Sequence, residues 1–93
     1  VERAPEHLLA WNGLGLAYAR VGHFAQAAEA LEQARKLDPR SPVTQTNLGV
    51  LAAYQRRWDD ARTAWTQAVT LDPRFAPAAD NLKSLDATPS SSP

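Results

Sequence analysis

The chain has 93 residues, 44% of them hydrophobic, and its ten basic and ten acidic side chains cancel to a formal net charge of zero. This length fits one compact domain rather than two, and the balanced charge argues against nucleic acid or an anionic membrane surface as a partner. No stretch approaches the roughly 18 to 20 apolar residues of a membrane helix, so we expect a soluble chain without membrane insertion. The absence of cysteine excludes disulfides and does not distinguish between compartments. The compartment is left open, and we favour the cytoplasm slightly over the periplasm.

The first part of the chain predicts two helices separated by a glycine turn. Apolar residues recur at spacings of three and four over residues 11–21 and again over 24–37, which is the period of a helix with one buried face. Gly22 between them can adopt the left-handed conformation that closes a helix. Pro39 disfavours helical geometry at Asp38 before it, so the second helix is predicted to end there.

Residues 41–75 predict a second pair of helices. Ser41 offers a hydroxyl cap and Pro42 follows it at the first helical position, a combination that is typical of a helix start. The turn between the two helices falls on residues 55–57 and contains no glycine, so other residues must meet its geometry. Two aspartates at 59–60 then lie in the first turn of the next helix, where carboxylates interact favourably with the helix N-terminus.

Residues 76–86 predict a last helix that closes the domain. Its apolar stripe is backed by polar residues, which suits a helix at the end of a stack of helices, because the stack would otherwise leave an apolar face in water. Residues 87–93 are rich in serine and proline and have no apolar stripe, so we expect this tail to be disordered. The sequence therefore predicts a single domain over residues 1–86.

The two helix pairs are copies of each other. A shift of 34 residues places Leu48-Gly49 on Leu14-Gly15 and Asp72-Pro73 on Asp38-Pro39, and alanines and a glutamine align between these motifs. A period of this length, built from two helices, indicates a helical repeat protein.

The repeat resembles the tetratricopeptide repeat, whose signature is Trp-x2-Leu-Gly-x2-Tyr, then Ala-x3-Phe, then Pro. The resemblance implies an all-α fold, a tetratricopeptide-type α-solenoid with two helix-turn-helix repeats, residues 8–41 and 42–75, and a C-terminal capping helix, residues 76–86. The matching positions hold Trp11, Leu14, Gly15, Tyr18, Ala27, Leu31 and Pro39 in repeat one, and Gln45, Leu48, Gly49, Ala52, Ala61, Trp65 and Pro73 in repeat two.

Small residues are predicted where paired helices approach each other, and bulky residues between the helices. Gly15 and Gly49 share one repeat position, at which a side chain would hold the two helices apart. The bulky residues expected to fill the interior are Trp11, Leu14, Phe24, Leu31, Trp58 and Trp65.

The resemblance also implies a binding face. In the tetratricopeptide family, the first helix of each repeat lines the concave side of the superhelix, and partners contact that side. Carried over to this sequence, these positions predict a protein-protein interaction module whose groove binds a peptide or helix of another protein. Its asparagines would offer amides to a peptide backbone, and its leucines and valines an apolar floor. The predicted groove residues are Leu9, Asn12, Leu16, Arg20, Val43, Asn47, Val50, Tyr54 and Asn81.

No residue pattern indicates catalysis. His7 and His23 have no histidine or carboxylate at the spacing of a helical metal pair, and a glycine-rich phosphate loop is missing. We therefore expect no enzyme activity, no metal and no cofactor.

Two other functions stay open. The first helix has no preceding helix over its outer side, so this uncapped N-terminal end could hold a second copy of the chain in a homo-oligomer. Alternatively, the chain is a non-catalytic arm of a larger enzyme or of a secretion component, an idea that its start at Val1 without methionine keeps open.

Overall fold

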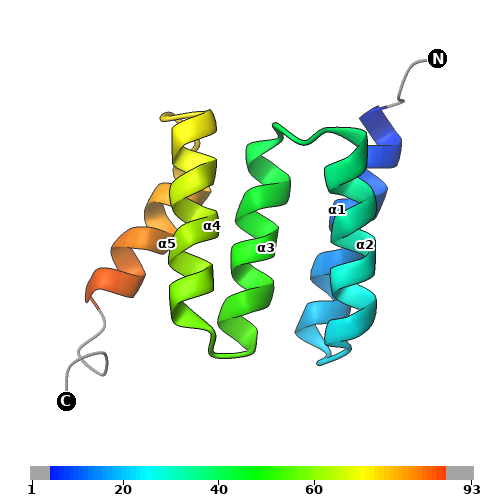
Figure 1. Ribbon diagram of the computed structural model, residues 1–93, viewed down its shortest axis with the longest axis horizontal. Helices are drawn as coiled ribbons and strands as arrows, with labels where there is room; N and C mark the ends of the chain where they lie inside the picture. Colours follow the sequence, from blue (N-terminus) through cyan, green and yellow to red (C-terminus); the bar gives the residue numbers. More distant parts are fainter. Residues whose placement is uncertain (1–4, 88–93) are drawn as a thin grey trace.

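The computed structural model describes residues 5–87, and these residues form five helices and no strand. Helices α1 and α2 run antiparallel side by side, α3 and α4 form a second such pair, and α5 lies against α4 (Figure 1). This arrangement confirms the predicted all-α solenoid of stacked helix pairs. The bounds are α1 Pro5–Arg20, α2 Phe24–Leu37, α3 Pro42–Tyr54, α4 Trp58–Leu71 and α5 Ala76–Ala87.

The two ends of the helical part differ slightly from the expected boundaries. Helix α1 begins at Pro5, three residues before the predicted first repeat, because the fixed φ of proline suits the first helical position. Helix α5 reaches Ala87, one residue beyond the predicted capping helix. The rest of the predicted tail, residues 88–93, lies outside the described residues.

Both repeats end their second helix with the same local chemistry. The Asp38 carboxylate accepts the backbone N–H of Arg40 at 3.1 Å, and Asp72 accepts that of Arg74 at 3.1 Å. Each aspartate sits in extended conformation just after its helix, so its side chain replaces the helical bonds that the following proline prevents. The chain therefore leaves α2 and α4 in the same direction.

The turns inside the two repeats are also alike, although only one contains glycine. Gly22 has φ 87°, and Arg56, at the equivalent position, has φ 62°. In both turns the next backbone N–H bonds to the carbonyl five residues earlier, at 2.9 Å. Repeat two thus meets the left-handed geometry with an arginine, which costs about 1 to 2 kcal/mol relative to glycine.

The paired helices touch at the two predicted glycines. A Cβ atom added to Gly15 would lie 2.6 Å from Cγ of Leu31, and one added to Gly49 would lie 2.5 Å from Cδ1 of Trp65. Leu31 is fully buried and Trp65 is 6% exposed. Only the missing side chain lets these bulky residues of α2 and α4 lie against the backbones of α1 and α3.

The core runs through the stack as two clusters of buried residues, and each cluster joins three helices. The first brings α1, α2 and α3 together, and the second brings α3, α4 and α5 together. The first contains Ala19, Ala27, Leu31 and Leu51, and the second contains Ala52, Ala61, Trp65, Ala68 and Ala78.

Two residues that were expected in the interior are not buried. Leu14 is 43% exposed and Trp58 is 49% exposed. Leu14 lies on the side of α1 that no described helix covers. Trp58 begins α4, where α5 diverges from it toward the C-terminus (Figure 1). Its counterpart Phe24, by contrast, is packed against the first buried cluster.

Candidate protein-binding face

The first helices of the repeats and the capping helix share one side of the molecule. Helix α3 packs against α1 and makes few contacts with α5. Residues spaced by four, three and four positions form a stripe on one side of each helix, and we call these three stripes the groove face. They are Leu9, Gly13, Leu16 and Arg20 on α1, Val43, Asn47, Val50 and Tyr54 on α3, and Pro77, Asn81 and Ser84 on α5.

The predicted groove residues other than Asn12 all belong to these stripes. Leu9 is 67% exposed, Tyr54 is 48% exposed, and Arg20 is also exposed. The remaining predicted members are half-buried; they are Leu16, Val43, Asn47, Val50 and Asn81.

Asn12 was predicted to offer its amide to a partner, and the structure contradicts this. Its side chain is 4% exposed, and its Nδ2 donates to Oγ1 of Thr44 at 3.0 Å and to the carbonyl of Leu8 at 3.2 Å. Its Oδ1 accepts from Nδ2 of Asn47 at 3.2 Å. The Ser41 hydroxyl in turn accepts the backbone N–H of Thr44 at 3.4 Å. Asn12 therefore ties α1 to α3 and does not face a groove.

Asn47 lies at the edge of this polar junction and also on the groove face. One of its N–H groups is used by Asn12, whereas its carbonyl oxygen and second N–H have no partner among the described residues. An amide fixed in this way presents an acceptor and a donor at low entropic cost.

A small pocket opens beside the groove face between α4 and α5. It has a volume of about 150 Å³. Sequence reasoning missed it, because both of its tryptophans were assigned to the interior. The sequence clue to this pocket is side-chain size at equivalent repeat positions. Trp58 and Trp65 of the second repeat are larger than Phe24 and Leu31, their counterparts in the first repeat. The pocket is lined by Trp58, Trp65, Asn81, Ser84 and Leu85.

Charge is sparse on the groove face. Arg20 is the charged residue among its members. A separate ion pair, Glu32 with Arg35, lies on α2 at 2.5 Å. The hydrogen bond from Arg35 holds the pKa of the Glu32 carboxyl below its usual value. Recognition on the groove face would therefore rest on apolar contact and hydrogen bonding more than on charge.

The described residues do not assemble a reactive centre. His7 and His23 are both exposed, and the His23 ring stacks on Tyr18 with the centroids 6.1 Å apart. Among the side chains that the structure describes, no three histidine or acidic groups gather where they could hold a metal ion. None of the five described helices has the length and apolar character needed to cross a membrane.

Comparison with known families agrees with the repeat geometry. The family model of the tetratricopeptide repeat matches the chain twice, over residues 8–41 and 43–75. The chain belongs to the tetratricopeptide repeat family. The resemblance inferred from the signature residues is thereby confirmed. Because tetratricopeptide repeats generally mediate protein-protein interaction, membership indicates a protein partner.

A curated relative that the chain resembles is a much longer protein. Over 85 residues the chain is 29% identical to the SPINDLY protein of Hordeum vulgare, described as a probable UDP-N-acetylglucosamine–peptide N-acetylglucosaminyltransferase. The match covers 84% of this chain and 9% of that protein. The chain therefore spans a small part of the length of this relative.

The second tetratricopeptide repeat departs from the family signature at its tyrosine position, which Ala52 occupies. Ala52 is 8% exposed and belongs to the second core cluster. Tyr54, two residues later, is the last residue of α3 and lies on the groove face instead.

Proposed function

We propose that this tetratricopeptide module binds a segment of another protein on the groove face. The observation that carries the proposal is the combination of half-buried Leu16, Val43 and Val50 with the exposed side chains of Leu9 and Tyr54. An apolar floor with an exposed aromatic beside it is typical of a surface where a partner helix or peptide is buried.

The pocket between α4 and α5 supports an apolar anchor on the partner. Its volume of about 150 Å³ resembles that of a protein cavity that holds a benzene ring. Trp58 and Trp65 line it with aromatic surface, and Asn81 and Ser84 connect it to the groove face. The partner segment would place a leucine or phenylalanine side chain there, while its backbone meets the Asn47 amide.

Binding to selected peptides tests the proposal. Peptides are selected from a random displayed library against the chain, and their affinity is measured by calorimetry. Tyr54→Ala is expected to weaken binding by about 2 kcal/mol, roughly 30-fold in Kd, because exposed aromatic anchors dominate such interfaces. Folding should change little, since Tyr54 is 48% exposed and belongs to neither core cluster.

The matched control is Gln67→Ala on α4, an exposed residue of a second helix. This variant is expected to bind the same peptides as the parent chain does. Loss of binding by Gln67→Ala and not by Tyr54→Ala would show that the peptides bind near α4 and not on the groove face. Equal affinity of all three proteins would show that the groove face does not bind.

A second candidate function follows from the similarity to a glycosyltransferase. The chain would then be a non-catalytic arm that holds a protein substrate for a catalytic domain in the same polypeptide. The 29% identity to the Hordeum vulgare protein and the 9% share of its length support this role. Sequencing the gene on both sides tests it, and flanking sequence without any catalytic domain would contradict it.

A further inference from the structure

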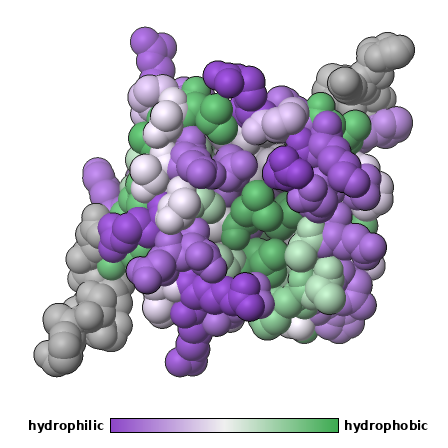
Figure 2. Space-filling model, in the orientation of Figure 1, coloured by the Kyte–Doolittle hydropathy of each residue, from purple (hydrophilic) through white to green (hydrophobic). Residues whose placement is uncertain are grey.

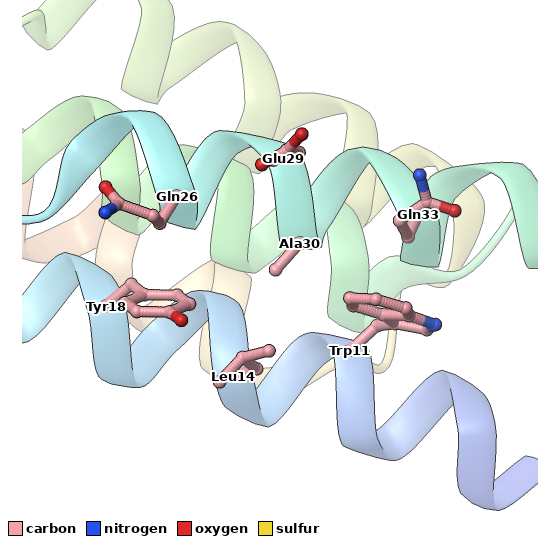
Figure 3. Close-up of a pocket in the computed structure, with 7 residues that line it drawn as sticks. All are labelled: Trp11, Leu14, Tyr18, Gln26, Glu29, Ala30 and Gln33. Carbon is pink, nitrogen blue, oxygen red and sulfur yellow. The ribbon is translucent and has the colours of Figure 1, made fainter.

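The side of α1 turned away from α3 is an apolar surface that no helix in the described part of the chain covers. We call it the outer face of α1. The rings of Trp11 and Tyr18 lie between α1 and α2 at the two ends of an open cleft, with Leu14 between them (Figure 3). The cleft has a volume of about 230 Å³. Ala30 adds to its apolar lining, and its polar rim is formed by Gln26, Glu29 and Gln33 of α2.

The equivalent face of repeat two is covered by a helix. Leu48 of α3 corresponds to Leu14, and it packs against the buried cluster that includes Leu31 of α2. Ala52, at the position of Tyr18, is 8% exposed. The fold itself therefore shows that a face of this type, when it is buried, packs against another helix.

The opposite end of the molecule cannot supply that helix. One side of α5 covers α4, and Asp80 and Lys83 are exposed on its other sides. Lys83 stands at the repeat position of Gly15 and Gly49, so no helix can approach α5 as α2 approaches α1. Figure 2 shows the side of the molecule on which α2, α3 and α4 face the viewer, with apolar surface near the junction of α2 and α3 and mixed white and hydrophilic side chains over α4. The charged side chains on the free sides of α5 therefore disfavour head-to-tail stacking of copies.

The outer face of α1 suits an identical face. Between residues 10 and 21 it carries no charged side chain, and exposed Ala10 and Ala17 lie along one edge of the larger Leu14 and Tyr18. When two such helices cross antiparallel about a two-fold axis, the large residues of each lie against the small residues of the other. The formal net charge of zero adds no long-range repulsion between two copies.

We infer that two copies of this chain associate through the outer face of α1 into a closed two-fold dimer. The two α1 helices pack antiparallel with Leu14, midway between Ala10 and Tyr18, nearest the axis. Association stops at two because an interface between identical faces closes on itself. The groove face lies on another side of α1 and stays free, so this inference is independent of the proposed function.

Sedimentation equilibrium at rising concentration tests the dimer. The parent mass is expected to rise from 10.1 kDa to twice that value and no further. Leu14→Glu is expected to raise the dimer dissociation constant about tenfold or more, because it brings two like charges together near the axis. Ala17→Glu, at an exposed position of the same face, is expected to act in the same way, and circular dichroism checks that both variants fold.

The matched control is Leu9→Glu, which adds the same charge to the same helix on the groove face and should leave the dissociation constant unchanged. A parent mass that stays at 10.1 kDa, or that grows beyond a dimer, overturns the inference. Equal dissociation by the Leu9 and Leu14 variants also overturns it.

Crosslinking gives a second readout, because the chain contains no cysteine. Oxidation of the variant Leu14→Cys is expected to yield a covalent dimer, since residues near the axis come within disulfide reach. Leu9→Cys is expected to yield none. The reverse pattern would show that the copies do not meet through the outer face.

Discussion

Replacing Gly49 by alanine is expected to destabilise the fold, although alanine is the better helix former by about 1 kcal/mol. The added methyl group would lie 2.5 Å from Cδ1 of Trp65, and such overpacking costs about 1 to 3 kcal/mol. The indole cannot step aside freely, because its Nε1 donates to the carbonyl of Thr46 at 3.0 Å. Loss of that buried bond adds about 1 to 3 kcal/mol. The net loss of stability is therefore about 1 to 5 kcal/mol.

Urea unfolding measures this loss as a fall in the transition midpoint at unchanged slope. The control is Gly13→Ala in α1, where an added Cβ meets nothing within 4 Å. This variant gains the helix propensity without the clash and should be more stable by about 0.5 to 1 kcal/mol. If Gly49→Ala were as stable as Gly13→Ala, the close approach of α3 and α4 would not constrain the fold, and the reasoning would be wrong.

Four further changes test the local geometry. Gly22→Ala should cost about 1 to 2 kcal/mol because φ is 87°. Arg56→Gly, at φ 62°, should instead gain up to about 1 kcal/mol after the greater unfolded-state entropy of glycine is subtracted. Thermal melts that shift in the same direction for both variants would contradict one of these two predictions. Asn12→Ala should lower the stability by about 1 to 3 kcal/mol, because it leaves the Thr44 hydroxyl and the Asn47 amide without their hydrogen-bond partner. An unchanged midpoint of urea unfolding would show that these hydrogen bonds between α1 and α3 do not stabilise the fold. Leu31→Ala, at a fully buried site, should cost about 2 to 5 kcal/mol in the same assay, and a loss below 1 kcal/mol would show that the cavity collapses.

Much of the fold follows from periodicity and from the repeat signature. The helices, the turns after Asp38 and Asp72, and the close approach at Gly15 and Gly49 depend on local sequence and on one internal comparison. Burial of single side chains depends on neighbours in other elements. Leu14 and Trp58 fit the pattern of core residues, yet one faces an uncovered side of α1 and the other lies where α5 diverges from α4.

The candidate site was less predictable than the fold. Asn12 and Asn47 sit at adjacent repeat positions, and only the packing of α1 against α3 decides that Asn12 turns inward to Thr44. The pocket that contains Trp58 and Trp65 depends on the angle between α4 and α5, which no single segment encodes. The sequence shows which residues share one face of a helix. It does not show which residues of two different helices contact each other.

The weak contact between α5 and α3 has a consequence for the dynamics of the domain. Because α5 contacts α4 more extensively than it contacts α3, it can detach while the four preceding helices remain folded, as terminal units of repeat proteins do. Its amide hydrogens should then exchange faster than those of α3. Each detachment of α5 would carry Asn81 and Ser84 away and expose Trp65. The part of the groove face on α5 can therefore move relative to the parts on α1 and α3. A partner that contacts both α3 and α5 would bind only those molecules in which α5 is packed against α4. Its apparent affinity would therefore rise with any change that stabilises α5 in this packed position.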